Sequence, residues 1–169
     1  EAWRRLKLDP NKTELLLVGN LQKDVRLLLE RQSLPAGVRI IPGVSRNELK
    51  KLYESAHAFV LPSIQDGFGM VLGEAMASGL PVIASTNTGA PDILQNESEG
   101  MIFPAGNAEA LAHCILQLYK DPKLCLNMSI KGQERIKDFT WQRYGDMTIK
   151  TYHQLLEKHE SSTYRQIQL

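Results

Sequence analysis

The sequence has 169 residues, of which 43% are hydrophobic and 23% are charged, and its formal net charge is +1. This length and balance predict one folded domain with its own core and argue against a disordered chain. The strongly apolar runs, such as residues 15–18, are far shorter than the roughly 20 residues that a membrane-spanning helix needs.

Charge and cysteine content narrow the range of partners. The near-zero net charge is too small to indicate a nucleic-acid partner, because polyanion binding depends on many Lys and Arg side chains. Cys114 and Cys125 form no disulfide or metal motif, and the four histidines show no metal-ligand spacing. We therefore expect no metal and no cofactor, and a reducing, cytoplasmic location.

Short β-rich runs alternate with stretches of helical period along the chain. The patterns predict strands at residues 14–18, 38–41, 58–61, 82–85 and 101–103. They predict helices at about 25–34, from 46 onward, and at 70–78, 108–120, 122–138 and 141–158. Ser45 and Glu48 have the spacing of a capping box at the start of the second of these helices.

This alternation predicts parallel βαβ units. The expected fold is therefore α/β, a Rossmann-like doubly wound parallel sheet with helices on both faces, followed by a helical C-terminal region. We expect one domain over residues 1–160 and a flexible tail over residues 161–169. Four apolar side chains recur at helical spacing in the last helix and are typical of a core-facing stripe: Trp141, Tyr144, Met147 and Tyr152.

The loops that follow the third and fourth strands are the expected ligand site, because doubly wound sheets bind ligands beyond the carboxyl ends of their strands. The loop at 62–69 contains two glycines and leads into a helix, whose free N-terminal amides suit a phosphate. Asp66 precedes this helix and Glu74 lies within it, so two carboxylates flank the expected anion site. The same residues also fit a simpler interpretation, in which Asp66 caps the helix and Glu74 is solvated.

Several segments in order resemble the signature of retaining glycosyltransferases of family 4 (group 1), which have the glycosyltransferase-B fold of two Rossmann-like domains. They are Phe59-Val-Leu-Pro-Ser63, the Gly-Phe-Gly turn at 67–69, Glu-Ala-Met-Ala-Ser-Gly-Leu-Pro-Val-Ile at 74–83, Gly-Ala-Pro-Asp at 89–92, and Phe-Thr-Trp at 139–141. By this resemblance residues 1–160 are the donor-binding half of the enzyme, truncated on the N-terminal side. Its substrate is a UDP- or GDP-linked sugar, used in glycan, lipopolysaccharide, exopolysaccharide or glycolipid synthesis.

The resemblance also implies roles for individual residues. Glu74 holds the ribose of the nucleotide, Asp66 contacts hydroxyls of the transferred sugar, and Val44 lies against the base. The sugar and diphosphate oxygens meet the backbone around five residues, namely Gly67, Phe68, Gly69, Met70 and Val71. The acceptor binds to a separate N-terminal domain, which also provides any peripheral contact with the cytoplasmic face of a membrane.

The chain departs from the family pattern at three points. It reads Gly19-Asn20-Leu21 after the first strand, where the family often has Gly-x-Gly. Asp66 stands where the family usually has Glu, and the Arg and Lys that clamp the diphosphate belong to a segment upstream of Glu1. We therefore expect the isolated chain to be inactive. The alternative is a degenerate, non-catalytic nucleotide-sugar-binding or scaffold module of the same fold. A dinucleotide-dependent oxidoreductase is disfavoured, because no Gly-x-Gly-x-x-Gly turn follows a strand.

Overall fold

The computed structural model describes residues 1–167, and the side chains of these residues except Leu28 and residues 160–167. Five strands and eight helices alternate along this part of the chain. The strands are β1 (Leu15–Val18), β2 (Val38–Ile41), β3 (Phe59–Leu61), β4 (Val82–Ser85) and β5 (Gly100–Phe103). The helices are α1 (Ala2–Leu6), α2 (Lys23–Arg31), α3 (Arg46–Ser55), α4 (Met70–Ala77), α5 (Ala90–Ile93), α6 (Ala108–Lys120), α7 (Pro122–Ile136) and α8 (Trp141–Ile167).

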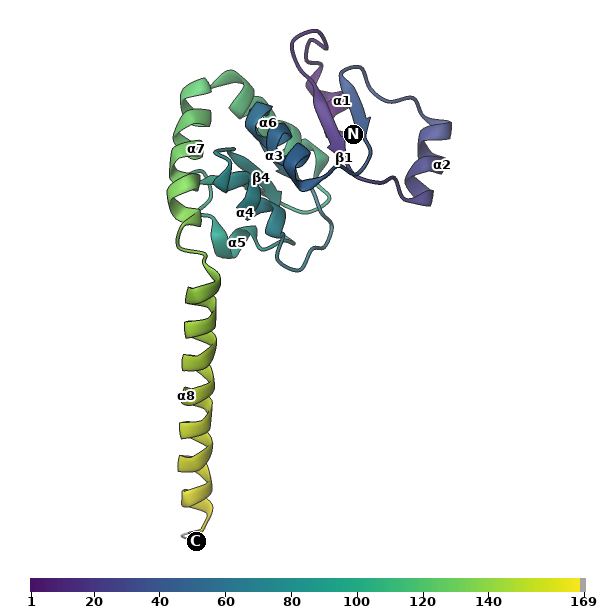
Figure 1. Cartoon of the computed structure of the whole chain (residues 1–169). Coiled ribbons are helices and arrows are strands. Elements are labelled where there is room, and N and C mark those ends of the chain that lie inside the picture. The colour runs from purple at the N-terminus through teal and green to yellow at the C-terminus, as the bar shows by residue number, and fades with distance from the viewer. Residues whose placement is uncertain (168–169) are drawn as a thin grey trace.

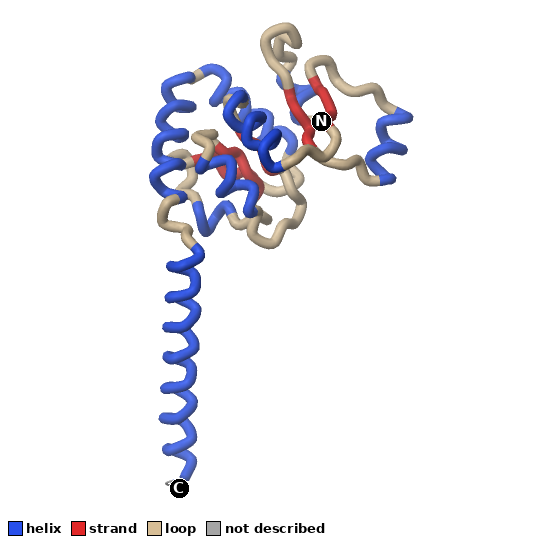
Figure 2. The backbone as a smooth tube through the Cα atoms, in the orientation of Figure 1, coloured by secondary structure: helices blue, strands red, loops and turns tan. Residues whose placement is uncertain are grey.

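The predicted α/β architecture is confirmed, and every strand pair between these elements is parallel. The strands form two sheets rather than one, however, with the orders β1-β2 and β3-β4-β5. Figures 1 and 2 show the β1-β2 pair and α2 standing beside the larger body that holds β3, β4 and β5. Neither β1 nor β2 pairs with β3, although the sequence pattern predicted that all of these strands belong to one sheet.

Helices cover both faces of the three-stranded sheet, as predicted. Alternate residues of β4 point to opposite faces, so Val82 and Ala84 join one core cluster while Ile83 joins the other. The first cluster contains side chains from α3, α4 and α5, and the second contains side chains from α1, α6 and α7. β4 is buried along its whole length, so the core lies around this central strand.

Local sequence signals explain where several helices begin. Ser45 and Glu48 form the predicted capping box at the start of α3: the Glu48 N–H donates to Ser45 Oγ, and the Ser45 N–H donates to a Glu48 carboxylate oxygen. The Ser45 hydroxyl also donates to the Glu48 carboxylate, and this bond, followed by that from the Ser45 N–H, lowers the pKa of Glu48. Asn107 caps α6 and Asp121 caps α7 through their side-chain oxygens. The short helix α5 follows Gly89 and was not predicted.

The last helix, α8, extends away from the rest of the molecule as a long rod (Figure 1). It continues to Ile167, beyond the predicted end at residue 158. The prediction that its apolar stripe belongs to the core is wrong for this chain, because Trp141, Tyr144, Met147 and Tyr152 are all more than half exposed. No helix among the described residues is long and apolar enough to cross a membrane.

Candidate functional site

The segment between β3 and α4 forms a loop over residues 62–69, at the carboxyl end of the sheet. Gly69 is the residue before α4 and has a left-handed backbone with φ of 71°, a conformation that favours glycine. A Cβ at this position would also come within 3.0 Å of a Leu61 methyl group. Gly69 therefore allows the chain to turn sharply from β3 into the helix.

The N-terminus of α4 is free of any side-chain cap. The Leu72 N–H donates to the Gly69 carbonyl, whereas the amides of Met70 and Val71 precede the first intrahelical bonds. The interpretation of Asp66 as a helix cap is therefore wrong. The positive end of the helix dipole faces the loop, and an uncapped end of this kind can receive an anion.

The neighbouring loop after β4 holds the 62–69 loop in place. The Asp66 N–H donates to the Asn87 carbonyl at 2.9 Å, and the Asn87 side-chain amide donates to the Ile64 carbonyl at 2.9 Å. Ser85 Oγ donates to the Ser63 carbonyl. The loop after the fourth strand was expected to contribute to the site, but no residue of it was predicted to do so. The signal for these contacts was the polar run Ser-Thr-Asn-Thr at 85–88, which begins at the last residue of the fully buried β4.

The two loops touch where Gly89 meets Phe68. A Cβ on Gly89 would lie 2.2 Å from the Phe68 carbonyl oxygen, so only glycine fits at this point. Gly67, by contrast, has open space around it. The backbone of the 62–69 loop is thus held by contacts with the loop after β4, whereas its Gly67 side is exposed to solvent.

The two predicted carboxylates flank the uncapped helix end along the chain. Asp66 is half-buried in the loop, and Glu74 is exposed on α4, about 6 Å along the helix axis from Met70. Among the described residues neither carboxylate makes a hydrogen bond or an ion pair. Phe68 and Met70 are also largely exposed beside them. Two free carboxylates, free amides and an exposed apolar surface therefore meet at one end of the sheet.

Tyr53 on α3 is the titratable neighbour of Glu74. Burial raises the pKa of the Tyr53 hydroxyl, and the negative charge of Glu74 raises it further. The Tyr53 ring packs edge-on against Phe59 with 5.8 Å between ring centroids. Tyr53 thus remains neutral and, with Phe59, forms a packed surface near Glu74.

Val44 lies in the loop that follows β2, a strand of the smaller sheet. Its neighbour Gly43 donates its N–H to Asn20 Oδ1, which joins the carboxyl ends of β2 and β1. The structure therefore gathers residues 66–71 and Glu74 on one β3–α4 unit. Val44 lies on a separate unit, after the carboxyl end of β2.

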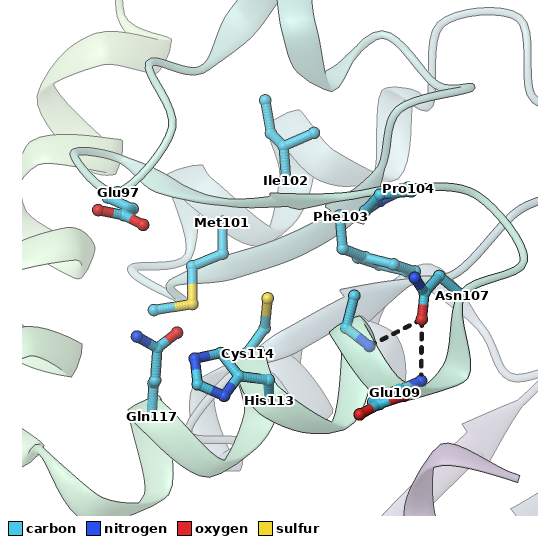
Figure 3. A pocket seen from close by; sticks show the side chains of 11 residues that line it. Glu97, Met101, Ile102, Phe103, Pro104, Asn107, Glu109, His113, Cys114 and Gln117 are labelled. Atoms are coloured by element: carbon cyan, nitrogen blue, oxygen red, sulfur yellow. Dashed lines mark hydrogen bonds between the residues drawn. The ribbon is translucent and has the colours of Figure 1, made fainter.

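A hollow of about 470 Å³ lies elsewhere, between β5 and α6 (Figure 3). None of the predicted donor-binding residues lines it. His113 and Cys114 project toward it from α6, and burial raises the pKa of the Cys114 thiol, which disfavours the reactive thiolate. Within the described residues no group of three or more His, Cys, Asp or Glu could hold a metal ion.

Comparison with known proteins places this geometry in a family. Residues 1–135 match the family described as "Glycosyl transferases group 1". The chain belongs to this family. It is 30% identical over 125 residues to O-antigen chain mannosyltransferase B from Escherichia coli, and the match covers 74% of this chain and 32% of that protein. It is 31% identical over 126 residues to the amylovoran biosynthesis glycosyltransferase AmsK from Erwinia amylovora, which covers 70% of this chain and 31% of that protein.

Solved structures of glycosyltransferases share the fold. Sucrose-phosphate synthase from Thermosynechococcus elongatus is 30% identical with a TM-score of 0.71, and the match covers 86% of this chain and 39% of that chain. The group 1 chain spans about a third of the length of the curated relatives that it matches. The family assignment agrees with the resemblance in the 59–92 region.

Proposed function

We propose that this group 1 chain is the donor-binding half of a retaining glycosyltransferase of family 4, and that it holds a UDP- or GDP-linked sugar at the start of α4. The observation that carries the proposal is the pair of unpaired carboxylates, Asp66 and Glu74, on either side of an uncapped helix N-terminus. A nucleotide sugar has the matching order of groups, with hydroxyls on both sides of a diphosphate.

In this arrangement Glu74 accepts hydrogen bonds from the ribose hydroxyls. Its place within α4, against the wall formed by Tyr53, gives the carboxylate a defined direction. Asp66 lies before the helix and accepts from hydroxyls of the transferred sugar. Val44 approaches the base from the smaller sheet.

The backbone at 67–71 stabilises the leaving group. During transfer the bond between the anomeric carbon and the diphosphate oxygen breaks, and a bond to the acceptor oxygen forms on the same face of the sugar. The acceptor hydroxyl transfers its proton to the departing diphosphate oxygen, on which the negative charge of the broken bond develops. Amides of Gly67, Phe68, Gly69, Met70 and Val71 are in the region where this charge develops, and such dipoles are most effective when held in place beforehand. The contacts of Gly89 and Asn87 with the loop provide that rigidity.

Asp66 supports a second candidate function, a non-catalytic module that binds the nucleotide sugar without transferring it. Its side chain is one methylene shorter than the Glu of the family pattern and reaches less far toward a sugar. The two functions separate in the full-length protein: a module retains nucleotide affinity with no transfer of sugar to any acceptor.

The Glu74→Gln variant tests the donor site. A charge-assisted hydrogen bond contributes about 1.5–3 kcal/mol, so we expect the affinity for the nucleoside diphosphate to fall by roughly 10–150-fold. Calorimetric titration of the full-length protein with UDP and with GDP measures the change. Glu54→Gln, at an exposed position on α3, is the matched control and should bind as the parent does. Equal affinity of the Glu74→Gln variant and the parent contradicts the assignment.

A further inference from the structure

Helix α5 is too short to be stable by itself. It has four residues, Ala90–Ile93, and Pro91 in its first turn has no N–H group to donate. Isolated helices of fewer than about 12 residues are marginal in water, so contacts with other elements must hold α5 in place. Ala90 and Ile93 are almost fully buried and belong to the core cluster that contains Leu72 of α4. The position of α5 therefore depends on the contacts at its two ends.

The N-terminal end of α5 adjoins the candidate site. The Ile93 N–H donates to the carbonyl of Gly89, the residue that approaches the Phe68 carbonyl so closely that a Cβ has no room. Two residues before Gly89, the Asn87 carbonyl accepts from the Asp66 N–H at 2.9 Å. A shift of α5 would therefore displace the residues that hold the loop between β3 and α4.

The C-terminal end of α5 meets Arg135, in the last turn of α7 (Figure 1). The carbonyl groups at the end of a helix have no partner within the helix, and a buried carbonyl needs one. Ile93 is buried, and Arg135 Nε donates to its carbonyl at 3.0 Å. Arg135 thus ties the end of α5 to α7.

Two residues that follow α7 hold the Arg135 side chain. The Asp138 carboxylate lies 3.7 Å from Arg135 Nη1, and the guanidinium lies over the Phe139 ring with Cζ 5.0 Å from the ring centroid. A cation over an aromatic face is attracted to the ring. Phe139 also begins the Phe-Thr-Trp segment at 139–141 that resembles the glycosyltransferase signature. The Arg135 guanidinium is therefore held in one direction at the end of α5.

The next residue of α7 contacts α4. Ile136 packs against the core cluster that contains Leu72, and a Cβ on Gly73 would lie 3.3 Å from Ile136 Cδ1. Gly73 directly precedes Glu74, the carboxylate proposed to hold the ribose. The end of α7 therefore lies against both α4 and α5, the two helices that adjoin the candidate site.

We infer that Arg135 is a positioning residue for the candidate site. It fixes the C-terminal end of α5, and through Gly89 and Asn87 it fixes the backbone of the 62–69 loop, which carries Asp66. Arg135 acts through α5 and not on a substrate. Its effect on sugar transfer rests on the proposed function, whereas its effect on the loop does not.

Amide hydrogen exchange of the full-length protein, measured by NMR without nucleotide, tests the effect on the loop. Arg135→Met removes the donor but keeps the apolar stem of the side chain. Lys137→Met is the matched control, because the Lys137 side chain follows the same helix and is 69% exposed. We expect the Asp66 and Ile93 amides to exchange at least about tenfold faster in Arg135→Met than in Lys137→Met. The Leu118 amide, within α6, should not change.

Steady-state kinetics of the same variants, with a panel of UDP- and GDP-linked sugars, test the link to transfer. Relative to Lys137→Met, we expect kcat of Arg135→Met to fall at least about tenfold and KM for the donor to rise less than about threefold. The reason is that the loop amides act mainly on charge that develops in the transition state. Unchanged exchange of Leu118 shows that the lower kcat is not a loss of folded protein.

Three results overturn the inference. One is equal exchange of Asp66 in Arg135→Met and Lys137→Met. Another is equal acceleration of Asp66 and Leu118 in Arg135→Met, which shows a general loss of stability. The third is faster exchange of Asp66 with an unchanged kcat. A parent protein that transfers no sugar contradicts the proposed function instead, and the exchange measurement then still decides whether Arg135 holds the loop.

Discussion

The two parts of the molecule differ in how far they are buried. The part that contains β3, β4 and β5 holds nearly all of the buried apolar side chains, including Leu72, Ile83 and Met128. The part that contains β1 and β2 has no fully buried residue in either strand. Both parts follow the same βαβ pattern, so the difference does not come from composition. It comes from the cover on each sheet: helices pack on both faces of the three-stranded sheet, whereas no residue of β1 or β2 belongs to either core cluster.

This difference indicates where a rigid site can form. The 62–69 loop and α4 stand on the well-packed part, and the loop after β4 holds them by hydrogen bonds. Val44 follows β2 in the weakly packed part, where neither strand contains a fully buried residue. The proposed diphosphate and sugar contacts thus stand on the well-packed part, whereas the proposed base contact depends on the position of the smaller sheet.

Removal of one leucine from each part gives the largest expected contrast. Leu72→Ala leaves a cavity in the core and should lower the free energy of unfolding by about 2–5 kcal/mol. Leu17→Ala, on half-exposed β1, should cost less than about 1 kcal/mol. Urea denaturation of both variants measures the two losses. Equal losses for the two variants contradict the expected difference between the two parts.

The junction between the two loops is the next test. Gly89→Ala introduces a Cβ against the Phe68 carbonyl, so the loops must separate and we expect a loss of about 1–3 kcal/mol. Gly67→Ala, in open space of the same loop, is the matched control and should stay within about 0.5 kcal/mol. Thermal unfolding gives the stability, and NMR shifts of residues 62–69 report the displacement. A Gly89→Ala variant as stable as the parent shows that the loop yields easily.

Substitution of Asp66 tests whether the well-packed part also contributes to sugar transfer. Asp66→Ala in the full-length protein should lower turnover by at least about tenfold, which corresponds to roughly 1.4 kcal/mol of transition-state stabilisation. Asp66→Glu should change the ranking of donor sugars, because a site that bonds a hydroxyl discriminates strongly, while nucleoside diphosphate affinity stays within about threefold. A donor panel with matched nucleotide titrations measures both effects. Unchanged turnover of Asp66→Ala removes the catalytic role.

The smallest effect is expected in the β1-β2 part. Arg39 on β2 pairs with Glu14 at 2.6 Å, but both side chains are about half exposed. Exposed ion pairs contribute about 0.2–1 kcal/mol and are screened by salt. Arg39→Ala should therefore cost no more than that in urea denaturation at low salt, and less at about 0.5 M salt. A larger, salt-independent loss shows that this part is more tightly held than its exposure indicates.

Much of the local structure was predictable because its causes lie close together in the sequence. The strands at 38–41 and 82–85 and the helix at 108–120 match the predicted bounds, and Ser45 with Glu48 caps α3 as expected. The position of Asp66 and Glu74 around a helix start was equally predictable. The roles of Asn87 and Gly89 were not, because these residues act on a loop some twenty positions earlier in the chain.

The sequence by itself determined the order of strands and helices, their parallel α/β character and the segment with the functional signature. These follow from apolar periodicity, capping residues and glycine turns, which act over a few residues. Only the tertiary structure decided that the sheet divides between β1 and β3, that Asp66 leaves α4 uncapped, and that Trp141 and Tyr152 lie in the open. The physical reason is that the sequence shows which strands and helix faces are apolar. Whether these residues are buried depends on contacts with residues that are far apart in the chain.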